Sequence, residues 1–233
     1  MGARESASPK GNERAQRRYL ARRLEILRAA GKAFRTRGFA ETGMRDIAAA
    51  ADLSPANLYN YFRGKDEILF FCQDVSLDRL LAALESVRRS RHSTAEKLRI
   101  VIGAHLRCVL DEIEGSAAHL FAGGLAPKLQ DRLIAKRDRY EDGVRQLIAG
   151  GIRNGEFAAC DAALAARAIL GALNWSVRWY RPGGTLSANE IAERFADFLI
   201  RGLSKNAGTI RHAARNSKMA RNGRAVRLAE VNG

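Results

Sequence analysis

The chain has 233 residues, of which 46% are hydrophobic, and it carries a formal net charge of +15. This length is enough for one or two domains with a real core, and the hydrophobic share argues against a disordered chain. No run of about 18 apolar residues predicts a membrane span, and no apolar stretch follows the positive N-terminus as in a secretory signal. The three cysteines are scattered and fit no metal spacing, so we expect a cytoplasmic protein with reduced thiols.

The positive charge is concentrated at the two ends of the chain. Residues 1–65 contain 14 Lys and Arg against 6 Asp and Glu, residues 66–203 contain 19 against 18, and residues 204–233 contain 7 against 1. A basic end domain is the electrostatic feature expected of a protein that binds a polyanion. For residues 204–233, which we expect to be disordered, a solvated tail without a binding role stays an open alternative.

The N-terminal region predicts a disordered basic arm followed by a helix. Residues 1–17 are polar, and the apolar positions that begin at Leu20 then repeat at helical spacing. This helix should end near residue 37, because Gly38 tolerates the left-handed conformation of a helix cap. With such a cap, Phe39 can fold back onto Phe34.

Two short helices joined by a tight turn come next. Thr42 is a candidate N-cap for a helix over about residues 43–51, and Asp52 tolerates the left-handed conformation of the turn. In the third helix, over residues 54–62, Ser54 is the N-cap and Pro55 takes the first helical position. Leu58 and Phe62 fall on one side of this helix at about 100° per residue.

The opposite side of the third helix is small and polar. It carries Ala56, Asn57 and Asn60, with Tyr59 and Tyr61 at its two edges. Short side chains allow close approach to a DNA major groove, amides can pair with base edges, and hydroxyls can contact phosphates. An ordinary short helix with exposed polar residues is the alternative, but the paired helices and the basic charge favour DNA binding.

The rest of the chain predicts further helices and no strand. Ser93 and Glu96 form a capping box, Pro127 can open a helix, and Ser187 can cap the last one. We expect helices over about residues 65–88, 94–113, 116–122, 127–152, 160–180 and 188–203. The prediction is an all-α protein with about nine helices.

The segment "TGMRDIAAAADLSPANLYNYFRGKDEIL" resembles the helix-turn-helix signature of TetR-family transcriptional repressors. The resemblance covers about residues 18–69. It implies a three-helix DNA-binding domain over residues 18–65 and a ligand-binding and dimerisation domain over residues 66–203. It also implies a homodimer that binds a palindromic operator and is released by a small effector.

The family pattern also assigns roles to single residues of this segment. It implies Thr42 and Arg45 near the DNA backbone, Asn57 and Asn60 towards bases, and Tyr59, Tyr61 and Lys65 on phosphates. Ser54 and Ala56 complete the candidate DNA-binding set. The sequence departs from the family pattern at Asp52, Pro55, Ala56 and Gly64. These departures leave the operator sequence open, but they do not affect the class of protein.

A second segment, "NWSVRWYRPGGTLSANEIAERFADFLIRGL", resembles the end of a TetR subgroup that senses acyl-CoA thioesters, including regulators of fatty-acid and steroid catabolism. It suggests an acyl-CoA effector with Trp175, Arg178 and Arg181 as ligand-binding residues. Core or dimer packing is the alternative for the tryptophan, and solvation or ion pairing is the alternative for the arginines. A hydrophobic drug-like molecule is the alternative effector.

Other classes of protein fit the sequence less well. The four histidines show no ligand spacing, and the GxSxG, P-loop and Rossmann glycine patterns are absent from the sequence. We therefore expect neither an enzyme nor a bound cofactor or metal. A basic protein that binds nucleic acid without sequence preference, or a structural protein, is the remaining alternative.

Overall fold

The structure is a computed structural model, and it describes residues 9–111 and 125–205. Within these ranges the regular elements are eight α-helices and one π-helical turn, with a single isolated bridge between Phe157 and Ser204 in place of any strand. The helices are α1 (Pro9–Arg37), α2 (Met44–Ala50), α3 (Pro55–Tyr59), α4 (Lys65–Arg88), α5 (Thr94–Leu106), α7 (Pro127–Arg153), α8 (Ala162–Trp179) and α9 (Ala188–Leu203), and the π-helical turn is η1 (Arg107–Asp111). The all-α prediction is confirmed. The helix expected near residues 116–122 and the tail from residue 206 lie outside the described residues.

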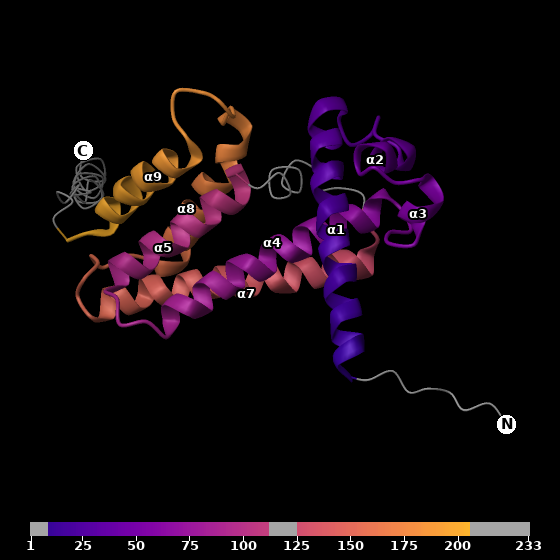
Figure 1. The fold of residues 1–233 in the computed structure, drawn as a ribbon. Coiled ribbons are helices and arrows are strands. Elements are labelled where there is room, and N and C mark those ends of the chain that lie inside the picture. Colours follow the sequence, from indigo (N-terminus) through magenta and orange to yellow (C-terminus); the bar gives the residue numbers. More distant parts are fainter. Residues whose placement is uncertain (1–8, 112–124, 206–233) are drawn as a thin grey trace, which may run out of the picture.

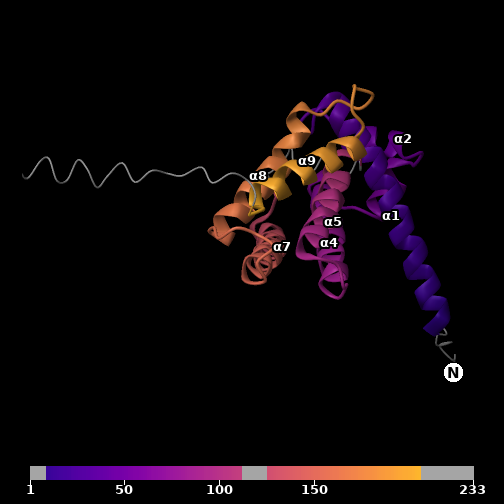
Figure 2. The ribbon, with the colours of Figure 1, turned by 90° about the vertical axis from the view of Figure 1, so that its left-hand side faces the viewer.

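The helices form two groups that α4 connects (Figure 1). Helices α1, α2 and α3 gather at one end, while α5, α8 and α9 gather at the other. Helix α4 runs from the first group into the second with α7 beside it, and α5 packs against α9 (Figure 2). Helix α4 is therefore part of both groups of helices.

The N-terminal group is held by a core of its own. Its buried residues are Ile26, Leu27, Ala30, Phe34, Ile47, Ala48, Leu58, Phe62, Ile68, Phe71 and Cys72. The last three come from α4, so the first two turns of that helix belong to the N-terminal core. The domain boundary expected at residue 65 falls at the start of α4, before these contacts are complete.

An arginine also joins α1 to α4 at the edge of this core. The guanidinium of Arg23 lies over the rings of Phe62 and Phe71, with distances of 4.4 and 4.1 Å to the ring centroids. The same group donates a hydrogen bond to Glu67 at 3.3 Å. Cation–π contact and the ion pair together fix the angle between α1 and the start of α4.

The turns between the first helices follow the predicted chemistry at three points. Gly38 has φ +85° and Asp52 has φ +53°, both left-handed, and the rings of Phe34 and Phe39 lie 5.0 Å apart. The N-cap of α2 differs from the prediction, because it is Gly43. The hydroxyl of Thr42 instead donates to the Gly38 carbonyl at 2.7 Å, where it holds the turn rather than the helix end.

Residues 9–17, expected to be part of a disordered arm, form the first turns of α1. The expectation rested on low apolar content, but a helix that projects into solvent needs no apolar face. Pro9 suits the first helical position, and Glu13 and Arg17 form an i,i+4 ion pair at 3.8 Å.

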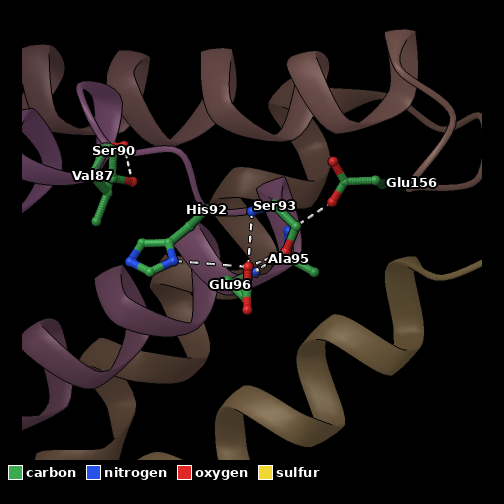
Figure 3. A network of polar contacts seen from close by, with 7 residues as sticks. All are labelled: Val87, Ser90, His92, Ser93, Ala95, Glu96 and Glu156. Carbon is green, nitrogen blue, oxygen red and sulfur yellow. Dashed lines mark hydrogen bonds and ion pairs between the residues drawn. The ribbon is translucent and has the colours of Figure 1, made fainter.

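The C-terminal group has a larger core and well-capped helices. At the start of α5, the Ser93 backbone N–H donates to Glu96 at 2.8 Å and the Ser93 hydroxyl accepts from the Glu96 N–H at 3.2 Å (Figure 3). Glu156, between α7 and α8, accepts from the Ala95 N–H at 3.0 Å. The capping box predicted at Ser93 is confirmed. Ser187 caps α9 as predicted, and it also forms a capping box with Glu190, which was not predicted.

Candidate DNA-binding surface and effector cavity

Helix α3 presents a polar face to solvent and an apolar face to the N-terminal core. Leu58 and Phe62 are buried, as the sequence predicted. The exposed residues of the segment are Ser54, Pro55, Ala56, Asn57, Tyr59 and Asn60. The helix ends at Tyr59, earlier than predicted, but Asn60 keeps helical angles of φ −68° and ψ −19°. The side-chain amide of Asn60 donates to the side-chain oxygen of Asn57 at 3.3 Å, so the two side-chain amides lie together on the surface.

The groups that flank this polar face differ in how they are held. Tyr59 is 53% exposed, whereas Tyr61 is partly buried and stacks on Tyr19 of α1 with 5.3 Å between ring centroids. Arg45 of α2 is exposed. Tyr19 was absent from the sequence-based candidates, because only the folded chain brings it beside Tyr61.

Two other candidates for DNA contact, Thr42 and Lys65, make contacts within the protein itself. Thr42 has no exposed surface. The ammonium of Lys65 donates to the carbonyls of Phe39 and Ala40 at 3.0 and 3.1 Å and lies 4.7 Å from the centroid of the Phe39 ring. Both side chains hold the segment between α1 and α2, and Thr42 cannot touch a phosphate in this conformation.

A cavity of about 360 Å³ lies between α4, α5, α7 and α8. Its lining residues within the described ranges are Gln73, Ser76, Leu77, Leu80, His105, Arg137, Tyr140, Glu141, Leu170 and Asn174. Arg137 and Asn174 are exposed, so they mark the rim, and Glu141 is half-buried beside them. A volume of this size and a mixed lining are typical of sites for small molecules.

A chain of hydrogen bonds crosses one wall of the cavity. His105 lies 3.0 Å from the Asn174 side-chain oxygen through Nε2 and 3.3 Å from the Tyr140 hydroxyl through Nδ1. Since the amide oxygen only accepts, Nε2 carries the proton and Nδ1 accepts from the tyrosine. Burial, with a contribution from Cys108, raises the pKa of Tyr140 above its usual range, so the phenol stays protonated.

Helices α4 and α7 are also joined by polar contacts beside the cavity. The Arg137 guanidinium donates to the side-chain oxygen of Gln73. One residue earlier, Lys136 contacts Asp74 at 2.6 Å and Asp78 at 2.7 Å. Burial opposes the charge of Lys136, but the hydrogen bonds and charges of the two aspartates together raise its pKa.

The three residues predicted to bind ligand lie outside the cavity lining. Trp175 is 63% exposed, and the Arg178 guanidinium lies 5.4 Å from the centroid of its ring. Arg181 donates to the carbonyls of Tyr180 and Arg178 at 3.1 and 3.4 Å. Helix α8 turns Leu170 and Asn174 to the cavity instead, a choice of face that the aromatic and arginine pattern could not reveal.

Helices α8 and α9 expose large apolar side chains on their outer faces. These residues are Leu164, Trp175 and Trp179 of α8 and Phe198 of α9, the last with 77% of its surface exposed. Trp179 stacks on Phe195 with 5.9 Å between ring centroids. Clustered apolar exposure of this kind marks interaction surfaces in soluble proteins.

Comparison with known proteins places this arrangement in a family. Residues 26–70 match the bacterial regulatory proteins of the tetR family, and residues 91–203 match the tetracyclin repressor-like C-terminal domain. The HTH-type transcriptional repressor KstR2 of Mycobacterium tuberculosis (strain ATCC 25618 / H37Rv) is 30% identical over 193 residues, which cover 79% of this chain and 94% of that protein. The chain belongs to the TetR family.

Solved structures of TetR proteins share its fold. PfmR from Thermus thermophilus superposes with a TM-score of 0.71 at 36% identity, covering 77% of this chain and 99% of PfmR. The ketosteroid transcriptional regulator KstR2 of Mycobacterium tuberculosis gives a TM-score of 0.71 at 27% identity, covering 79% and 95%. AibR, solved in complex with isovaleryl coenzyme A and operator DNA, shares the fold with a TM-score of 0.67 at 24% identity, covering 78% and 98%.

The predicted TetR membership and fold are thereby confirmed. As a TetR protein the chain has an N-terminal DNA-binding domain and a C-terminal ligand-binding domain, and the relative KstR2 is a transcriptional repressor. Among residues 9–111 and 125–205, no helix is long and apolar enough to cross a membrane. The same ranges hold no cluster of three His, Cys, Asp or Glu side chains suited to a metal ion.

Proposed function

We propose that this TetR protein is a ligand-responsive repressor that acts in the cytoplasm, binds a palindromic operator as a homodimer and is released by a small effector. One observation carries the proposal. The first turns of α4 pack into the DNA-binding core through Ile68 and Phe71, and its next turns line the cavity through Gln73, Ser76 and Leu80. A ligand that moves α4 therefore acts directly on the element that supports α3.

The DNA contacts proposed here centre on the exposed face of α3. Asn57 and Asn60 suit base edges, and Ser54 and Ala56 are small enough for close approach to the groove. We assign Tyr59, Tyr61 and Arg45 to phosphates, because the two tyrosines border that face, Arg45 lies on the preceding helix, and all three keep exposed surface. Thr42 and Lys65 act by holding the turn before α2, with Lys65 keeping one ammonium proton for a phosphate.

The homodimer proposal is supported by the exposed apolar residues of α8 and α9. A single short helix contacts too little DNA for high specificity, and a two-fold dimer doubles the contacts over a palindrome. Burial of Trp175, Trp179 and Phe198 between two copies would remove their apolar surface from water. Sedimentation at micromolar concentration measures the state directly, and a monomer would contradict the proposal.

The effector proposed is an acyl-CoA thioester. The cavity has the size of an acyl group rather than of the whole thioester, so the nucleotide part would lie outside. Arg178, on the helix that supplies the rim residue Asn174, and Arg181, just after the end of that helix, are both exposed and are candidates for its phosphates. AibR shows that a fold of this kind accommodates isovaleryl coenzyme A. A hydrophobic drug-like molecule is the alternative effector.

A DNA-release titration tests the proposal. The operator is first selected from random DNA, and the complex is then titrated with a panel of acyl-CoA thioesters, the matching free acids and coenzyme A alone. We expect thioesters to release the DNA and coenzyme A alone to leave it bound. Release only by a free acid or an unrelated aromatic drug would remove the acyl-CoA effector and leave a repressor with another ligand.

Competition between the selected palindrome and bulk DNA tests the remaining alternative. A non-specific basic protein would divide about equally between the palindrome and an equal mass of bulk DNA, whereas a TetR repressor should stay on the palindrome. Specific sites are bound more tightly than bulk DNA by about 10³-fold or more.

A further inference from the structure

Two residues of α4 that line the cavity each have a buried polar atom without a partner among the described residues. Gln73 and Ser76 are each only 4% exposed, and both line the cavity. Neither Nε2 of Gln73 nor Oγ of Ser76 has a hydrogen-bond partner in the described part of the chain. Buried polar atoms are almost always paired, so two unpaired ones in a cavity wall indicate groups that await a ligand.

The orientation of the Gln73 amide is fixed by its neighbour. The Arg137 guanidinium has only donors, so the amide atom that it contacts is the oxygen. The amide nitrogen therefore points elsewhere and can only donate. The Ser76 hydroxyl, one helical turn further along the same face of α4, adds a second donor.

The rest of the lining is apolar or already paired. Leu77, Leu80 and Leu170 supply apolar surface, and the proton of the Tyr140 hydroxyl is directed to His105. The cationic lining residue, Arg137, is exposed at the rim and donates to the side-chain oxygen of Gln73. A buried carboxylate would exchange its hydration for neutral donors, which is unfavourable, whereas a carbonyl oxygen matches two neutral donors.

We infer that the part of the effector inside the cavity carries a neutral carbonyl-type oxygen on an otherwise apolar body, and that Gln73 Nε2 and Ser76 Oγ donate hydrogen bonds to it. The inference rests on the proposed function of the cavity as the effector site and names the class of group that the site selects. Gln73 directly follows Cys72, a member of the N-terminal core. The oxygen is thus held at the end of the cavity nearest the DNA-binding domain.

Three bicyclic probes of matched shape test the inference without coenzyme A: 1-tetralone, tetralin and tetralin-1-carboxylate. Dissociation constants are measured by ligand-observed NMR on the full chain. We expect the ketone to bind about three- to tenfold more tightly than the hydrocarbon, as one or two neutral hydrogen bonds allow, and more tightly than the carboxylate. Equal binding of ketone and hydrocarbon, tighter binding of the carboxylate, or no binding by any probe would each overturn the inference.

Two variants assign the donors. Ser76→Ala removes one hydroxyl, and Gln73→Glu keeps an acceptor for Arg137 while replacing the donor. Each should reduce the preference for ketone over hydrocarbon about threefold or more, with the thermal unfolding curve checked for retained folding. Leu80→Met is the control, since it changes the apolar wall and should shift both probes alike. An unchanged preference in both variants would overturn the assignment, while DNA release by thioesters would still support the proposed function.

Discussion

The two cores of the molecule are built differently. The N-terminal core is small, and each of its helices buries large side chains against the others, with Arg23 closing its edge between two phenylalanine rings. The C-terminal core is larger, yet it encloses a cavity whose wall includes buried polar side chains. Close packing makes the first a rigid carrier for α3, and the cavity makes the second able to change on binding.

The largest expected effect comes from removing a central side chain of the small core. Phe62→Ala should lower the free energy of unfolding of the N-terminal core by about 3–5 kcal/mol, because Phe62 is buried and lies 5.6 Å from Phe71 by ring centroids. DNA binding should be lost while the C-terminal domain stays folded. Chemical denaturation followed by circular dichroism measures the change in stability, and Tyr59→Ala, at an exposed position, is the control for that measurement alone. If Phe62→Ala instead unfolded both cores together in a single transition, the two cores would not be separable.

A matched pair of glycines tests packing in the C-terminal core. A Cβ added at Gly151 would lie 2.3 Å from the buried Phe157 ring, so Gly151→Ala should cost about 1–3 kcal/mol. At Gly150, a Cβ would meet only the tip of Arg153 at 3.9 Å, so Gly150→Ala should stabilise α7 by about 0.5–1 kcal/mol. Thermal unfolding of the two variants should move in opposite directions. Equal shifts would mean that α7 can slide away from Phe157.

Different residues of the DNA-binding surface should control the choice between DNA sequences and the overall affinity for DNA. Asn57→Ala or Asn60→Ala should cost about 1–3 kcal/mol on the selected operator and relax the choice between sequences. Arg45→Ala should instead weaken all sites alike and reduce the slope of log affinity against log salt by about 1. Binding to a set of operator variants at several salt concentrations gives both quantities. Uniform weakening by the asparagine changes would contradict their assignment to bases.

The smallest expected effect is on the stability of the fold at acidic pH. Burial opposes ionisation of Glu156, but hydrogen bonds from the Thr94 and Ala95 backbone and from Asn154 lower its pKa. A carboxylate with a lowered pKa contributes its full stabilisation at pH values above its pKa in the unfolded chain. That stabilisation is lost as the pH falls through the lower pKa of the folded protein. Glu156→Gln should therefore show a shallower loss of stability below the ordinary glutamate pKa. Unfolding midpoints from neutral to acidic pH check this, and a curve parallel to the unchanged protein would refute it.

The N-terminal domain could be predicted from its sequence because its signals are local. A left-handed turn at Gly38 or Asp52 and a cap at Ser54 each depend on a few neighbouring residues, and the structure has all three. One of the differences from the prediction is Thr42, where two local uses of one hydroxyl compete. It can cap α2 or hold the preceding turn, and the tertiary packing of Phe34 and Phe39 favours the turn.

The cavity could not be predicted in the same way. Its walls come from four helices, and the contact between Gln73 and Arg137 joins residues 64 positions apart. Nothing in the local sequence distinguishes Asn174, which faces the cavity, from Trp175, which does not. Trp175 and Arg178 lie near the end of α8, and the helical register decides which face of that helix is turned inward.

The continuity of α4 has a thermodynamic consequence under the proposed function. If the effector weakens operator binding by some factor, operator DNA must weaken effector binding by the same factor, because the four states form a closed cycle. The free protein would therefore bind the effector more tightly than the operator-bound protein does. A gene controlled by a strong operator would need more effector for induction than one controlled by a weak operator, although both use the same cavity.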